Sequence, residues 1–153
     1  AAGAGASIAL ACDMVLAAES ARFIQSFSKI GLVPDAGSSW VLPRRIGMAR
    51  AMGLALTATA LTAAEAVACG LIWKSHADAA LLPAAEELTA TLASGPTTAF
   101  AATKMLMQHA ASTDFDTHLA LEASTQKSCA ESDDYSEGVE AFLQKRAAKY
   151  TGG

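Results

Sequence analysis

This chain of 153 residues has little charge, few cysteines and no apolar run of membrane-spanning length. Charged residues make up 17% of it, with 11 Lys and Arg against 15 Asp and Glu, for a formal net charge of −4 at pH 7. Because the basic residues are sparse and scattered, the sequence excludes a general attraction to nucleic acid or to anionic membranes. The densest basic group, Lys145, Arg146 and Lys149, is typical of a solvent-facing helix end.

The longest apolar stretches are interrupted by charged or hydroxyl-bearing residues, among them Asp13, Arg44 and Thr57. None therefore reaches the roughly 18–20 residues of a membrane-spanning helix. No basic segment precedes a hydrophobic run, so no signal peptide is predicted. Hydrophobic residues make up 52% of the chain, but many of these are alanines, which favour helices and close packing.

The three cysteines, Cys12, Cys69 and Cys129, are odd in number and widely spaced. Their helical or apolar contexts are typical of reduced thiols in the core of a cytoplasmic protein, rather than of disulfides or metal ligands. The three histidines are solitary and lack the spacing to other ligating residues that a metal site requires. We therefore expect a cytoplasmic protein that holds no metal ion.

The chain does not begin with Met, and it opens inside a Gly-Ala turn that no strand leads into. This beginning is typical of the later part of a longer polypeptide. Within the chain, the pair Gly95-Pro96 is the clearest boundary between segments. We therefore divide the chain into a mixed α/β part, residues 1–94, and a helical part, residues 95–153.

The first part is predicted to contain short elements. The small-residue turn feeds a short buried helix that ends near Ala11, and two strands, 14–17 and 22–25, follow on either side of a turn. Residues 26–36 are expected to form a loop, and two helices then follow, over 38–46 and 48–56. Gly47 is the break between these two helices.

Further along, residues Thr62 to Glu65 fit a capping box, and Gly70 is placed to end the helix that this box begins. Residues 71–74 are predicted to form a strand and residues 78–93 a helix. Three amphipathic helices are expected after Gly95-Pro96, over 97–111, 115–130 and 133–148.

The segment most informative about function runs Gly-Leu-Val-Pro-Asp-Ala-Gly-Ser-Ser-Trp, from Gly31 to Trp40, and follows the opening Gly3-Ala4-Gly5 by some twenty-five residues. Small residues let a backbone N–H approach a ligand closely. A lone acid in an apolar setting, here Asp35, is a carboxylate that an enzyme can desolvate and use to move protons. Taken locally, however, the same residues also fit a close-packed turn and a turn aspartate.

In this order and spacing, these motifs resemble the crotonase superfamily of enoyl-CoA hydratases and isomerases. The resemblance extends through Cys12-Asp13 to the ending Glu137-Gly-Val-Glu-Ala-Phe-Leu-Gln-Lys-Arg146, and Phe23 to Asp35 is most similar to the ring-epoxide isomerases of phenylacetate breakdown. It implies an α/β fold, a crotonase-like ββα spiral that is partial because its N-terminal part is absent. The C-terminal helices would form an oligomerisation region, in a trimer or a dimer of trimers.

The resemblance also implies site residues. Members of the superfamily bind acyl-CoA thioesters and stabilise a thioester enolate with two backbone N–H groups, and Ala4 matches the position of one of them. The second donor lies further upstream in the family, at a position that this chain does not contain. Asp35 matches the acid/base aspartate of several isomerases, and Val33, Phe27 and Trp40 are expected to desolvate it.

Family hydratases carry two water-handling glutamates at the positions of Ser7 and Phe27, so the resemblance disfavours simple hydration. Two interpretations of Ser7 remain open. Its hydroxyl either forms a hydrogen bond with the substrate or with Asp35, or it faces its own helix. Phe23, Phe27 and Trp40 are expected to line an acyl pocket that takes a ring, although core packing explains aromatic residues equally well.

Two residues near the C-terminus, Phe142 and Lys145, match positions that approach CoA in the family, although Lys145 equally fits a solvated helix end. Ser38 and Ser39 depart from the Gly-Gly-Thr that the family commonly has after the Ala-Gly, which adds two side chains at the helix entry beside Asp35.

The leading expectation is an isomerase of ring-1,2-epoxyphenylacetyl-CoA, with no cofactor beyond the CoA of the substrate. An enoyl-CoA hydratase or a Δ3,Δ2-enoyl or dienoyl-CoA isomerase of fatty-acid oxidation is the first alternative. A non-catalytic assembly subunit with the same fold is the second.

Overall fold

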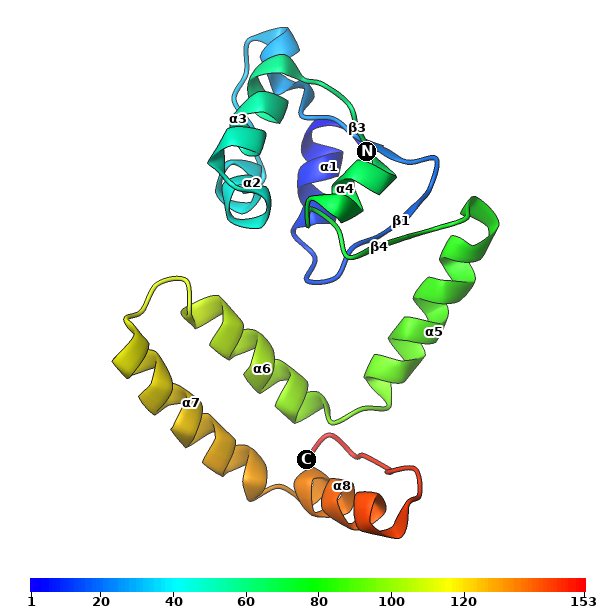
Figure 1. Ribbon diagram of the computed structural model, residues 1–153, viewed down its shortest axis with the longest axis vertical. Helices are drawn as coiled ribbons and strands as arrows, with labels where there is room; N and C mark the ends of the chain where they lie inside the picture. Colours follow the sequence, from blue (N-terminus) through cyan, green and yellow to red (C-terminus); the bar gives the residue numbers. More distant parts are fainter. The chain divides into compact units, whose positions relative to one another are not determined.

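The computed structural model describes residues 1–153 and divides into two compact units, Ala1–Ala85 and Glu86–Gly153 (Figure 1). The first unit contains α1 (Gly3–Leu10), β1 (Leu16–Ala18), β2 (Arg22–Phe23), the 3-10 helix η1 (Ser26–Ile30), α2 (Ser38–Ile46), α3 (Met48–Thr57), β3 (Leu61–Thr62), α4 (Ala63–Ala68), β4 (Lys74–His76) and the 3-10 helix η2 (Asp78–Ala80). The helix α5 (Leu81–Ala93) begins in this unit and ends in the second.

The strands of the first unit form two separate two-stranded sheets. Strand β1 pairs with β4 in parallel, with Leu16 opposite Lys74, and β2 pairs with β3 antiparallel, with Arg22 opposite Thr62. The two strands predicted over residues 14–17 and 22–25 are therefore both present, as β1 and β2. They pair with later strands and not with each other, because each finds its hydrogen-bonding partner beyond α3.

The core of the first unit lies where α1, α2 and α4 meet the strands. Its buried apolar residues are Leu10, Val15, Ala17, Phe23, Leu42, Ile46, Ala51, Ala63, Ala66, Leu71 and Ile72. Burial of apolar surface on this scale is the main favourable contribution to folding. The short helices and strands of the unit are therefore held mainly by this shared core, since each is too short to be stable alone.

Local signals set several helix boundaries as predicted. Gly47 has a φ of +76°, which separates α2 from α3. At the start of α4, the Thr62 hydroxyl accepts a hydrogen bond from the Glu65 N–H, and the Glu65 carboxylate accepts one from the Thr62 N–H. Gly70, with a φ of +77°, follows the end of α4. The predicted break, capping box and closing glycine are confirmed.

Two predictions in this unit are wrong in part. Residues 26–30 form η1, so the expected loop begins only at Gly31. The predicted strand at 71–74 is displaced to Lys74–His76, because the N–H groups of Leu71 and Ile72 donate to the Ala66 carbonyl at 2.9 and 3.3 Å. These bonds satisfy a carbonyl that the end of α4 leaves unpaired, and both side chains enter the core.

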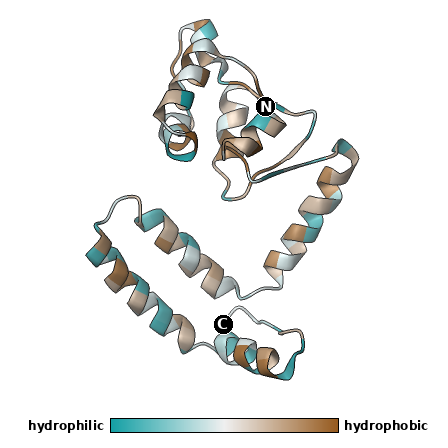
Figure 2. Cartoon of the chain, viewed as in Figure 1, coloured by the Kyte–Doolittle hydropathy of each residue, from teal (hydrophilic) through white to brown (hydrophobic).

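The second unit contains the end of α5, then α6 (Thr97–His109), α7 (Phe115–Ala130) and α8 (Asp133–Gln144). Asp114 caps α7 by accepting a hydrogen bond from the Thr117 N–H at 2.9 Å, and Ser132 caps α8 through the Tyr135 N–H at 3.1 Å. Consecutive helices pack against each other, α6 on α7 and α7 on α8. The three helices predicted here are present, with apolar residues recurring along them (Figure 2). The prediction of amphipathic character is wrong for α7, whose apolar residues do not gather on one face.

The last predicted helix is too long by four residues, because α8 ends at Gln144 and the chain folds back along it. Both Arg146 nitrogens Nη1 and Nη2 donate to the Glu137 carboxylate, at 2.6 and 2.8 Å. The buried Asp134, only 6% exposed, accepts hydrogen bonds from the N–H groups of Thr151 and Gly152 at 2.7 and 2.9 Å. The three residues of the C-terminal basic group, Lys145, Arg146 and Lys149, are exposed as predicted, and Arg146 in addition pairs with Glu137.

The three cysteines are unpaired. Cys69 and Cys129 are half-buried, whereas Cys12 is exposed, so the prediction of core thiols is wrong for Cys12. It follows α1 in an exposed turn rather than lying on its buried face. None of the helices combines the length and the apolar character that crossing a membrane demands.

Candidate active site

The start of α1 is built around a glycine in a backbone conformation that other residues rarely adopt. Gly3 has a φ of +51°, and its N–H donates to the Ile24 carbonyl at 2.9 Å. A Cβ atom at this position would lie 3.2 Å from Ser26 Oγ. A glycine is therefore needed here for two reasons, the left-handed backbone and the close approach of η1.

The next residue, Ala4, presents a free backbone donor. The Gly3 and Gly5 N–H groups on either side of it are engaged, with Ile24 and Ala2 carbonyls respectively, whereas the Ala4 N–H donates to no group in the structure. Ala4 is exposed and lies in the first turn of α1, where the helix dipole favours negative charge. This arrangement can stabilise an oxyanion.

Asp35 lies on a tight turn that leads into α2. The Ser38 N–H donates to the Asp35 carbonyl at 3.0 Å, and the two residues between them, Ala36 and Gly37, both have left-handed backbones, with φ of +47° and +80°. These angles are those of a type I′ turn. The Asp35 carboxylate is exposed and accepts no hydrogen bond in the structure.

The residues expected to desolvate Asp35 do not enclose it. Val33 and Trp40 are exposed, and only Phe27 is buried. The expectation of a desolvated carboxylate is wrong for this chain by itself, because the loop and the first turn of α2 leave Asp35 exposed.

Three aromatic residues are expected to line an acyl pocket. Phe23 belongs to the core of the first unit and Phe27 is also buried, so both pack inside the unit. Trp40 is 59% exposed, and the Arg44 guanidinium lies 3.7 Å from its ring centroid. Trp40 is therefore the member of this group with an accessible ring.

The positions of the two family glutamates carry no group that can activate water. Ser7 is buried, and its hydroxyl donates to the Gly3 carbonyl one turn earlier, at 3.2 Å. Of the two interpretations of Ser7, the structure shows the serine that faces its own helix. Phe27 is buried and has no polar side-chain atom.

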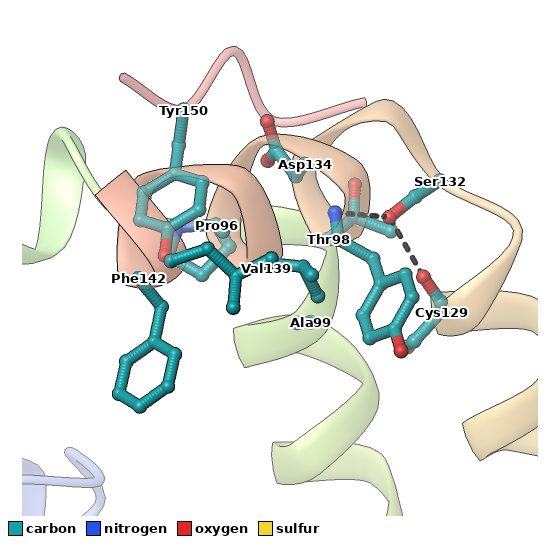
Figure 3. A pocket seen from close by; sticks show the side chains of 12 residues that line it. Pro96, Thr98, Ala99, Cys129, Ser132, Asp134, Val139, Phe142 and Tyr150 are labelled. Carbon is teal, nitrogen blue, oxygen red and sulfur yellow. Dashed lines mark hydrogen bonds between the residues drawn. The ribbon is translucent and has the colours of Figure 1, made fainter. Parts of the chain in front are cut away.

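The second unit holds the two residues matched to CoA-binding positions, at the C-terminal end of α8. Phe142 is 82% exposed, and it borders a mostly apolar groove of about 400 Å³ between α6, the end of α7, α8 and the C-terminal tail (Figure 3). Lys145 is exposed and has a left-handed backbone, with a φ of +54°. The hydrogen bonds from Arg146 lower the pKa of the neighbouring Glu137 carboxyl to about 2.

Sequence reasoning missed two polar residues of the first unit. Ser38 is buried, and its hydroxyl donates a hydrogen bond to the Asp35 carbonyl at 3.0 Å. The signal for this contact in the sequence is the departure from the family's Gly-Gly-Thr, which places a serine side chain directly after Ala36-Gly37. Gln25 is 3% exposed and its Oε1 atom has no hydrogen-bond partner. The signal for Gln25 is its alternation with the core residue Phe23, since residues two apart in an extended segment face the same side.

Comparison with known proteins extends this picture. The family model described as enoyl-CoA hydratase/isomerase matches residues 1–153. A relative from Rhodobacter capsulatus named probable enoyl-CoA hydratase is 50% identical over 152 residues, covering 99% of this chain and 59% of its own length. The 1,2-epoxyphenylacetyl-CoA isomerase of Escherichia coli K12 is 47% identical over 152 residues, covering 99% of this chain and 58% of the relative.

A solved structure, that of an enoyl-CoA hydratase from Polaromonas sp. JS666, matches with a TM-score of 0.95 and 36% identity over 99% of this chain and 59% of the other. The chain thus spans less than two thirds of the length of these relatives, and the expected partial crotonase-like fold followed by helices is confirmed. From its first residue to its last, the chain belongs to the enoyl-CoA hydratase/isomerase family, within the crotonase superfamily.

Proposed function

We propose that the protein is an acyl-CoA isomerase in which Asp35 moves a proton while the Ala4 N–H helps to hold an enolate oxygen. The observation that carries the proposal is that neither of these two groups has a hydrogen-bond partner in the structure. The Ala4 N–H at the start of α1 is unbonded, and the Asp35 carboxylate is unengaged on a tight turn of the same unit.

Each group suits its proposed role. A main-chain donor at a helix start cannot swing away as charge develops on the thioester oxygen, and loss of one such donor typically costs about 2.7–4 kcal/mol of transition-state stabilisation. A single carboxylate can take a proton from one carbon of the substrate and return it to another, with no water consumed. The second donor to the oxygen is assigned to a part of the protein outside this chain.

Isomerisation is favoured over hydration by what occupies the positions of the two family glutamates. The Ser7 hydroxyl donates a hydrogen bond to the Gly3 carbonyl, and the Phe27 ring is buried in the interior of the unit. Neither residue can position and deprotonate a water molecule as paired carboxylates do.

For the substrate we propose ring-1,2-epoxyphenylacetyl-CoA. The 47% identity to an isomerase named for that compound supports this choice. Trp40 would supply an exposed aromatic ring, on which the Arg44 guanidinium already stacks. Phe142 and Lys145 would contact the CoA portion, and no cofactor beyond CoA is required. A trimer or a dimer of trimers in the cytoplasm completes the proposal.

A second candidate is hydration of an enoyl-CoA, which is favoured by the 50% identity to a relative named probable enoyl-CoA hydratase. Crotonyl-CoA separates the two candidates. Rapid hydration of crotonyl-CoA by the protein would contradict the argument from Ser7 and Phe27.

The test is Asp35→Asn in the protein at its natural length, assayed with the ring epoxide. Loss of the proton-transferring group should lower kcat by about 10²- to 10⁴-fold. The matched control, Asp116→Asn, makes the same chemical change at an exposed residue of α7 and should keep wild-type turnover. Full activity of Asp35→Asn would refute the assignment, and absence of any turnover by the wild type would favour a non-catalytic subunit.

A further inference from the structure

Two donors of one residue converge on the backbone of Asp35. The Ser38 N–H and the Ser38 hydroxyl both donate to the Asp35 carbonyl oxygen, each at 3.0 Å. Ser38 is 1% exposed, so water does not compete for the hydroxyl as it would at the surface. The peptide group that follows Asp35 is thereby held by two hydrogen bonds.

The hydroxyl does not act as a conventional helix cap. A capping serine precedes the helix, and its oxygen accepts hydrogen bonds from the N–H groups of the first turn. Ser38 is instead the first residue of α2, the N-cap residue is Gly37, and the hydroxyl donates backwards to the loop. Its hydrogen bond therefore restrains the turn and not the free N–H groups of α2.

The turn needs such a restraint. Ala36 adopts a left-handed backbone, with a φ of +47°, which is unfavourable for a residue that carries a Cβ atom. The Asp35 carboxylate itself has no hydrogen-bond partner that would orient it. The direction in which this side chain leaves the backbone is therefore set by the turn alone.

We propose that Ser38 is a positioning residue, whose buried hydroxyl fixes the backbone of Asp35 and thereby aims its carboxylate at the reacting carbon. This inference rests on the proposed role of Asp35 in proton transfer. Proton transfer is sensitive to small displacements, so a hydroxyl that touches no substrate can still affect the rate.

The experiment compares Ser38→Ala with Ser39→Ala in the protein at its natural length. Ser39 is exposed and follows Ser38 in the same turn of α2, so it is the matched control. We expect Ser38→Ala to lower kcat about five- to thirtyfold, the effect of one buried hydrogen bond, with KM changed less than twofold. Ser39→Ala should keep both parameters. Circular dichroism at the assay temperature must show both variants folded.

A double-mutant cycle separates positioning from a general structural role. Asp35→Glu keeps a carboxylate but displaces it, so measurable activity remains. If Ser38 acts through Asp35, Ser38→Ala should cost little further activity in the Asp35→Glu background. An equal loss in both backgrounds, or an unchanged kcat in Ser38→Ala, would overturn the inference. Failure of the proposed function is seen separately, as full activity of Asp35→Asn.

Discussion

The Glu137 carboxylate binds the Arg146 guanidinium through two parallel hydrogen bonds, Nη1 to Oε1 at 2.6 Å and Nη2 to Oε2 at 2.8 Å. The same carboxylate accepts the Lys149 N–H at 2.7 Å. Bidentate pairs of this kind fix geometry as well as charge. They explain why the chain folds back beyond Gln144 instead of continuing α8.

This ion pair predicts a response to acid. The hydrogen bonds from Arg146, followed by the one from Lys149, lower the pKa of Glu137 from 4.5 to about 2. Because the folded-state pKa is the lower one, the ion pair stabilises the tail above pH 4.5 and is lost as the pH falls towards 2. We expect the Lys149 amide resonance to titrate with a midpoint near pH 2. Glu137→Gln should remove this titration, and a midpoint near 4.5 would contradict the assignment.

The turn at the start of α1 predicts opposite effects at two glycines. Gly3→Ala places a Cβ 3.2 Å from Ser26 Oγ on a left-handed backbone and should lower the free energy of unfolding by about 1–2 kcal/mol or more. A Cβ at Gly5 meets nothing within 4 Å, and its backbone is helical, so Gly5→Ala should raise the free energy of unfolding by about 0.5–1 kcal/mol. Denaturant titration of both variants checks the contrast, which equal destabilisation would refute.

The capping box of α4 predicts that losing the Thr62 hydroxyl lowers the free energy of unfolding, whereas a substitution that keeps the hydroxyl lowers it much less. Thr62→Ala removes the hydroxyl that accepts the Glu65 N–H and should cost about 1 kcal/mol of unfolding free energy. Thr62→Ser retains that hydroxyl and should cost much less. Thermal unfolding of the two variants provides the measurement. If the serine variant is as unstable as the alanine variant, packing of the threonine methyl and not capping is the cause.

The left-handed alanines predict a further contrast, between Ala36 and Ala58. Ala36 is exposed, so Ala36→Gly should relieve backbone strain of about 1–2 kcal/mol against an entropic cost of about 0.5–1 kcal/mol, a small net gain in stability. Ala58 has a φ of +51° but is buried, so Ala58→Gly also loses a buried methyl group worth about 0.8 kcal/mol. Chemical denaturation should give Ala36→Gly a higher free energy of unfolding than Ala58→Gly. The reverse order would show that the substitution does not relieve backbone strain at Ala36.

The sequence by itself determined the local structure and the family. The break at Gly47, the capping box at Thr62 and the end of α5 at Ala93, just before Gly95-Pro96, all lie where short-range patterns place them. The two compact units, in contrast, divide between Ala85 and Glu86 and not at Gly95-Pro96. These features depend on residues within about four positions of each other, through φ preferences, helix caps and missing N–H donors. The order of the small-residue motifs likewise pointed to the superfamily that the whole chain matches.

Only the tertiary structure decided which segments pair and which side chains are engaged. Strand β1 pairs with β4 rather than β2, and Asp134 and Glu137 accept hydrogen bonds from the tail that folds back along α8. Each of these contacts depends on backbone torsions and on segments that become neighbours only when the core forms. A propensity scale carries no information about which distant donor will reach a given acceptor, and that is the physical reason why the sequence could not predict them.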